Sequence, residues 1–88
     1  MKLKGSFVVR EVVGQWIAVP VGETALRFGG MIVLNPVSRV IWQALQTDTD
    51  IQAVISLVTD RFDVTAEEAQ KDVASFIQQM KNEDLIID

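Results

Sequence analysis

The stretch Gly30 to Leu45, GMIVLNPVSRVIWQAL, constrains the fold more than any other part of the chain. It begins with a run of apolar residues, Met31 to Leu34, which suits a strand covered on both faces. Asn35 and Pro36 follow at once and are typical of a helix start. Asn caps free backbone N–H groups, and Pro fits the first helical turn, where its missing N–H has no partner to lose. The sequence therefore predicts a strand that runs directly into a helix.

Two further strands are predicted before this stretch, over residues 7–13 and 16–21. Both segments are rich in β-branched and apolar side chains, and only Gly14 and Gln15 separate them. A two-residue Gly-X link is typical of a type II′ turn, so we expect the segments to pair as an antiparallel hairpin. Pro20 cannot donate to a sheet hydrogen bond and should lie near a strand end or at an unpaired edge.

Residues 22–30 form a connection that holds three of the five glycines. The pattern leaves open whether residues 25–28 make another short strand, because Gly29 and Gly30 could close a second tight turn. These two glycines could equally allow the close backbone approach of a bound molecule.

Three helices are predicted after the strand. They span about residues 36–45, 51–61 and 65–82. Thr49 or Asp50 would cap the second helix, and the spacing of Thr65 and Glu68 matches a capping box for the third. An apolar tail at residues 85–87 could dock on the core. This order predicts an α+β, winged helix-turn-helix-like fold in a single domain over residues 1–88, with an N-terminal three-stranded antiparallel sheet followed by a three-helix bundle.

Several residue types are missing, and their absence excludes classes of function. The chain contains no Cys, His or Tyr. It therefore cannot alone hold an iron–sulfur cluster or a zinc–thiolate site, and it lacks the usual general bases. We expect no enzyme activity, no metal and no cofactor. No apolar run reaches the roughly 18 residues of a membrane span, and the start MKLKGSF lacks a signal peptide's apolar segment, so we expect a cytoplasmic protein with no membrane partner.

Charge is distributed unevenly along the chain. Residues 1–47 carry five basic and two acidic side chains, whereas residues 48–88 carry three basic and ten acidic ones. The second half should repel phosphate and favour a cationic partner. A nucleic-acid-binding winged helix is therefore a weaker alternative, because the third helix lacks the clustered basic residues that phosphate contacts need. Another alternative is a structural homodimer in which open sheet edges pair with each other.

Three segments, taken in order, resemble the PqqD-like proteins, which are stand-alone RiPP recognition elements. The segments are LNPVSRVIWQAL, RFDV and TAEEAQKDVASFIQQMKNEDLI. The matching positions are Leu34-Asn35, Ile41-Trp42, Phe62-Asp63-Val64, Asp72-Val73, Phe76-Ile77 and Leu85-Ile86. The likeness covers residues 31–87. It departs at residues 35–38, where Asn-Pro-Val-Ser replaces the family's common Asn-Glu-Thr-Gly, and both versions are compatible with a helix start.

This resemblance implies a protein without catalysis of its own. Such a protein binds the leader of a ribosomally synthesised precursor peptide and presents the remainder to a modifying enzyme. In similar relatives that enzyme is often a radical S-adenosylmethionine (radical SAM) protein with a SPASM-type extension, and in the founding member the pathway leads to pyrroloquinoline quinone.

A physical account of such binding starts from the strand at residues 30–34. If it forms the sheet edge, its outward N–H and C=O groups can pair with an extended peptide, and the third helix can supply an apolar second wall. The candidate peptide-binding residues are Gly30, Met31, Ile32, Val33 and Leu34 on the strand, and Asp72, Val73, Phe76, Ile77 and Met80 on the helix.

The apolar residues of that helix, Val73, Phe76, Ile77 and Met80, are expected to be partly exposed toward the groove. For Phe76 plain core burial is the alternative. Asp72 and Glu68 lie one turn apart and could attract Lys or Arg of a leader, or could simply be solvated. Trp42 is assigned to the core, and Trp16 is a candidate exposed interface residue on the hairpin.

Overall fold

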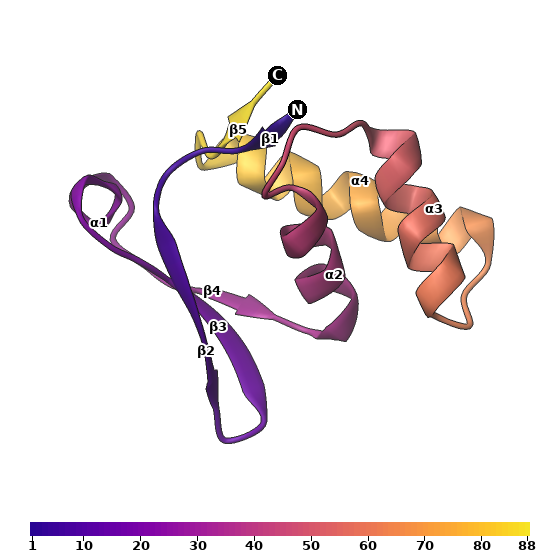
Figure 1. Cartoon of the computed structure of the whole chain (residues 1–88), viewed down its shortest axis with the longest axis horizontal. Coiled ribbons are helices and arrows are strands. Elements are labelled where there is room, and N and C mark those ends of the chain that lie inside the picture. The colour runs from indigo at the N-terminus through magenta and orange to yellow at the C-terminus, as the bar shows by residue number, and fades with distance from the viewer.

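The computed structural model describes all 88 residues, with the sheet before the three main helices (Figure 1). The elements are β1 (Lys2–Leu3), β2 (Phe7–Val12), β3 (Gln15–Pro20), α1 (Glu23–Arg27), β4 (Ile32–Leu34), α2 (Pro36–Ala44), α3 (Ile51–Arg61), α4 (Ala66–Asn82) and β5 (Ile86–Ile87). One antiparallel sheet has the order β2-β3-β4, and β1 pairs with β5 in a second, two-stranded sheet. The predicted α+β fold, a three-stranded antiparallel sheet followed by three helices, is confirmed.

The hairpin between β2 and β3 turns one residue earlier than the sequence predicted. Val13 and Gly14 form the turn, with φ of +50° and +78°, and Val12 pairs with Gln15 across it. Positive φ at both central residues is typical of a type I′ turn, which matches the right-handed twist of the strands. The expected Gly14-Gln15 turn is therefore wrong, because Gly14 occupies the second central position and not the first.

This register also determines where the backbone groups of β3 point. Val12 and Gln15 flank a two-residue turn, where the flanking residues form a hydrogen-bonded pair. Farther along the same ladder, the Val21 N–H donates to the Ser6 carbonyl at 2.9 Å. Hydrogen-bonded pairs alternate along an antiparallel ladder, so the odd-numbered residues of β3 bond to β2. The even-numbered residues consequently bond to β4.

The helix start that organises the chain forms as predicted. The Asn35 side chain accepts a hydrogen bond from the Ser38 N–H at 2.8 Å, and the Asn35 N–H donates to Ser38 Oγ at 2.8 Å. Pro36 occupies the first helical position. This reciprocal box satisfies two backbone donors, so β4 passes into α2 with a single extended residue between them.

The other two long helices are also capped at their starts. Asp50, one of the two expected caps, accepts from the Ala53 N–H at 2.9 Å at the start of α3. Thr65 Oγ1 accepts from the Glu68 N–H at 3.0 Å at the start of α4, and the same hydroxyl donates to Glu68 Oε1 at 3.1 Å. The Glu68 carboxylate thus contacts the Thr65 hydroxyl instead of the backbone N–H expected in a capping box.

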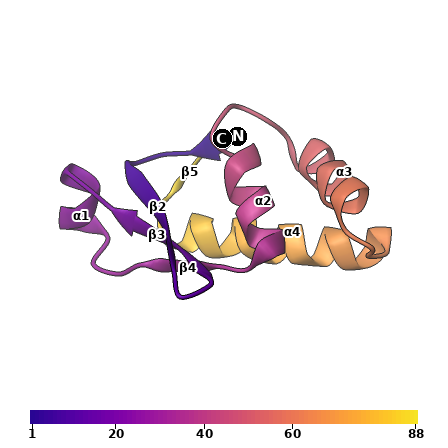
Figure 2. The ribbon, with the colours of Figure 1, turned by 60° about the horizontal axis from the view of Figure 1, so that its bottom comes forward.

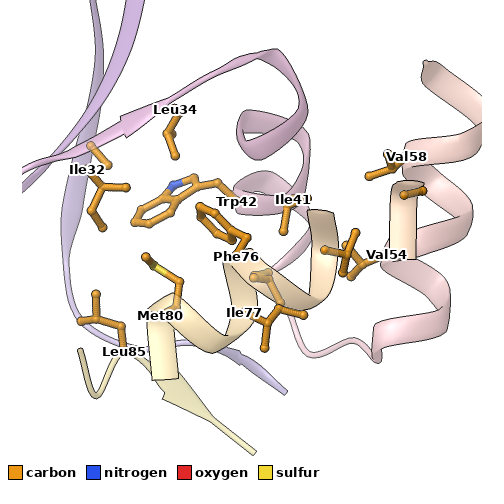
Figure 3. Close-up of a cluster of buried hydrophobic side chains, with 14 residues drawn as sticks. Ile32, Leu34, Ile41, Trp42, Val54, Val58, Phe76, Ile77, Met80 and Leu85 are labelled. Carbon is orange, nitrogen blue, oxygen red and sulfur yellow. The ribbon is translucent and has the colours of Figure 1, made fainter. Parts of the chain in front are cut away.

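The core lies where α2 and α4 meet the inner face of the sheet (Figure 2, Figure 3). Trp42 is 4% exposed and packs edge-to-face on Phe7, with ring centroids 5.1 Å apart, in agreement with its assignment to the core. Trp16 is half-buried, and the Arg39 guanidinium lies 3.5 Å above its ring. The expectation that Trp16 is exposed is therefore wrong, because Arg39 of α2 lies over its ring.

The segments that the pattern left open are also ordered. Residues 23–27 form the short helix α1, so the alternative of another strand over residues 25–28 is not realised. The apolar tail docks through β5 on β1, where Leu3 lies opposite Ile86. The chain ends therefore lie side by side, and the tail does not pair with β4 (Figure 1). None of the helices combines the length and the apolar character needed to span a membrane.

Candidate functional site

β4 is an edge strand with unpaired backbone groups. It pairs only with β3. In this pairing Leu34 of β4 lies opposite Trp16 of β3, and Ile32 of β4 lies opposite Ala18 of β3. Because these even-numbered β3 residues point their backbone groups toward β4, both pairs are hydrogen-bonded pairs. Val33 lies between them, so its N–H and C=O point away from β3 to the free edge. The strand therefore offers backbone donors and acceptors outside its own sheet.

A groove of about 830 Å³ runs beside this edge. Its walls are β4, the residue before it, the start of α2 and the facing side of α4. Met31 and Val33 form the exposed rim, with 60% and 58% of their surface accessible, whereas Phe76 and Met80 form the apolar floor. Figure 3 shows Phe76 and Met80 on the side of α4 that faces β4, with Phe76 next to the Trp42 ring in this view and Met80 pointing toward Ile32. A groove with an apolar floor thus lies directly next to free backbone groups.

Six of the ten residues predicted from sequence line this groove. They are Met31, Ile32, Val33, Asp72, Phe76 and Met80. They come from two elements separated by more than thirty residues in the chain, and the packing of α4 under the sheet brings them together. The expectation that Phe76 and Met80 are partly exposed is wrong, because they are only 8% and 1% exposed, and for Phe76 the alternative of core burial holds. Both residues nevertheless line the groove.

Four predicted residues do not line it. Leu34, Val73 and Ile77 are buried, and Gly30 is exposed but outside the lining. The expectation that Val73 and Ile77 are partly exposed toward the groove is wrong, because their side of α4 packs into the core with α2 and α3. Gly30 has no positive φ, and a Cβ there would meet only the Phe28 ring at an ordinary 3.9 Å. Neither a tight turn nor crowding therefore requires glycine at this position.

Comparison with known proteins gives one family. The family model for coenzyme PQQ synthesis protein D, PqqD, matches residues 10–86. The chain belongs to the PqqD family. A search of curated proteins found no significant match to this PqqD-family chain. Among solved structures, TbiB1 in complex with the TbiA(beta) leader peptide matches its fold with a TM-score of 0.72 and 15% identity, over 100% of both chains.

Sequence reasoning missed part of the groove of this PqqD-family chain. The missed lining residues are Phe28, Asn35, Pro36, Val37, Ser38, Ile41, Phe62, Ser75, Gln79 and Glu83. Three of these could have been found, because Ser75, Gln79 and Glu83 follow Asp72 at steps of three or four residues and so share its side of a helix. Phe28 and Phe62 had no comparable signal, because only the tertiary packing brings them to the groove.

Proposed function

We propose that the chain is a non-catalytic adaptor that captures the leader of a ribosomally synthesised precursor peptide by strand addition at β4. It then presents the remainder of that peptide to a modifying enzyme of the radical SAM type with a SPASM-type extension. The observation that carries the proposal is the position of the groove beside the free edge of β4. The opposite edge of the same sheet, β2, has no such groove beside it.

The backbone of β4 supports pairing with a short extended segment. Val33 turns its N–H and C=O outward, and the Met31 C=O points the same way because the N–H of Ile32 points to β3, which allows three hydrogen bonds to an added strand. Three such bonds are worth about 1.5–4.5 kcal/mol in total, whereas ordering about six peptide residues costs roughly 6–12 kcal/mol. Backbone pairing alone therefore does not hold the peptide.

Apolar side chains of the peptide supply the remaining free energy in this proposal. An added strand alternates its side chains between the two faces of the sheet, so every second side chain faces the groove above Phe76 and Met80. Burying two or three of them gains roughly 1.5–3 kcal/mol each, and the walls at Val37 and Phe62 enlarge the apolar contact.

The chemistry of the comparison structure agrees with a peptide as the occupant. TbiB1 was solved with a leader peptide bound, and its fold extends over the whole of this chain. The carboxylates of residues 48–88 further disfavour nucleic acid as an occupant, because phosphate would be repelled.

A titration followed by NMR tests this proposal. The probe is a synthetic peptide that covers the N-terminal part of a short reading frame encoded beside this chain's gene, added to ¹⁵N-labelled protein. We expect the shifted amides to cluster at residues 31–35, along residues 72–82 of α4 and at Glu83, with little change in α3. Shifts confined to the outer surfaces of α2 and α3 would contradict the site, and the absence of shifts with every such peptide would contradict the function.

A further inference from the structure

The side of α4 that faces the groove carries a polar row above its apolar floor. Asp72, Ser75, Gln79 and Glu83 line the groove at successive turns. Asp72 and Glu83 are 11 residues apart, which at 1.5 Å per residue separates them by roughly 16 Å and rotates them by only about 20° around the helix axis. The two carboxylates therefore stand at the two ends of one straight wall, on the same side of the helix.

No basic side chain lines the groove, so these two carboxylates have no cation within it. The ion pairs of the protein join the Met1 amine to Asp48, Lys4 to Asp84 and Lys81 to Asp88, and none of them involves Asp72 or Glu83. Glu83 also caps the C-terminal end of α4, where the helix dipole adds negative potential. Glu68, which the sequence suggested as the companion of Asp72, contacts Thr65 and does not line the groove.

We propose that the peptide taken by this groove is basic, with Lys or Arg at two positions that flank a short apolar segment. This inference rests on the proposed function and specifies its substrate. An extended strand advances about 3.3 Å per residue and repeats its facing every second residue, so cations four or six positions apart lie on the same face, span roughly 13–20 Å and can reach both carboxylates. The apolar residues between them face Phe76 and Met80.

The magnitude of this preference is moderate, because Asp72 and Glu83 are both exposed. Each exposed ion pair is worth up to about fivefold in affinity, and replacing the cation with an acid turns attraction into repulsion. We therefore expect a peptide with two flanking Lys to bind roughly 10- to 100-fold more tightly than the same peptide with two flanking Glu at low salt. The gap should narrow at high salt, because exposed charges are screened.

The experiment selects binders from a random library of 12-residue peptides displayed in vitro, using the full-length protein as bait. The double variant Asp72→Lys/Glu83→Lys is selected in parallel. A matched control, Glu11→Lys/Asp60→Lys, has the same net charge and changes two exposed carboxylates outside the groove. Thermal unfolding by circular dichroism verifies that each variant is folded, and the neutral pair Asp72→Asn/Glu83→Gln replaces the reversal if it is not.

Each result has a defined meaning. The proposal is supported if Lys and Arg are enriched at two positions four or six residues apart on the wild type and on the control, and if the double variant enriches Asp and Glu there instead. If the neutral variant Asp72→Asn/Glu83→Gln is used instead, loss of the preference for basic residues supports the proposal. Equal enrichment of acidic and basic flanks on the wild type, or the same change in the control as in the double variant, overturns it.

A separate outcome concerns the proposed function itself. Enriched peptides that shift the amides of β4 without any charge preference leave the adaptor function standing and remove only the inference about basic residues. No enrichment of any peptide over background, or enriched peptides that leave β4 unaffected, overturns the strand-addition function and this inference together.

Discussion

Replacing Val33 with proline tests strand addition with little change to the fold. The Val33 N–H points to the free edge of β4, so its loss removes no hydrogen bond to β3. Proline is tolerated on edge strands where the missing N–H faces solvent, and the Val33 side chain is largely exposed. We expect the free energy of unfolding to change by less than about 1 kcal/mol.

The effect on peptide binding should be larger. The variant loses one backbone hydrogen bond, worth about 0.5–1.5 kcal/mol, and the proline ring occupies the space in which a carbonyl of the added strand would lie. Together these effects predict a loss of at least about 1.4 kcal/mol, which is a tenfold increase in Kd. Fluorescence anisotropy with a labelled leader or library-selected peptide measures the change directly.

Glu11→Pro provides the matched control on the opposite edge of the sheet. Glu11 lies opposite Trp16, whose backbone groups point toward β4, so the N–H of Glu11 also points outward from β2. We expect this variant to bind the peptide within about twofold of the wild type. Normal binding by Val33→Pro would refute pairing at β4, and an equal loss in Glu11→Pro would show that the effect is not specific to that edge.

Three further predictions concern stability. Val13 has φ of +50°, which is unfavourable for a β-branched residue by about 1–2 kcal/mol. Val13→Asn should therefore raise the midpoint of urea unfolding. An unchanged or lower midpoint would contradict a type I′ turn as the source of strain. Asn35→Ala removes a helix cap and should cost about 0.5–2 kcal/mol by the same measurement, whereas a negligible cost would mean that water replaces the cap. The Met1 amine donates a hydrogen bond to Asp48 and also carries a positive charge, and both hold the pKa of this carboxyl below its ordinary value of 3.8. The contact therefore stabilises the fold above that pH, and this stabilisation is lost as the pH falls through the folded-state pKa. Acid titration of stability should therefore be shallower for Asp48→Asn than for the wild type, and identical curves would contradict the contact.

Local signals in the sequence were sufficient for the central stretch. The Asn35-Pro36 pair marks a helix start by itself, and the structure places β4 and α2 on either side of it. The hairpin was predicted correctly as a pair of strands, but its turn was displaced by one residue. The glycine of the Val-Gly-Gln sequence can take either of the two central positions of a two-residue turn. Only the register of the β2–β3 ladder, in which Val12 pairs with Gln15, determines which position it takes.

The groove depended on tertiary packing that helical periodicity could not supply. Periodicity identified Val73, Phe76, Ile77 and Met80 as one apolar face of α4, but α4 packs against α2, α3 and β5 at once, so all four are buried and only Phe76 and Met80 also line the groove. The next row around the helix, which contains Ser75, Gln79 and Glu83, shares the side of Asp72 by its spacing, but that spacing alone does not distinguish a groove wall from solvated surface. It becomes a wall of the groove only because β4 lies across from it.

The helix cap at Asn35 also limits the length of the docking edge. Asn35 is extended, with φ of −77° and ψ of 174°, so its backbone groups would continue the outward series of Met31 and Val33. Its N–H instead donates to Ser38 Oγ, and its carbonyl accepts from the Arg39 N–H at 2.8 Å. The free edge therefore ends at Val33. A peptide paired with so short an edge gains little from its backbone, so its affinity and its register must come from the side chains that enter the groove.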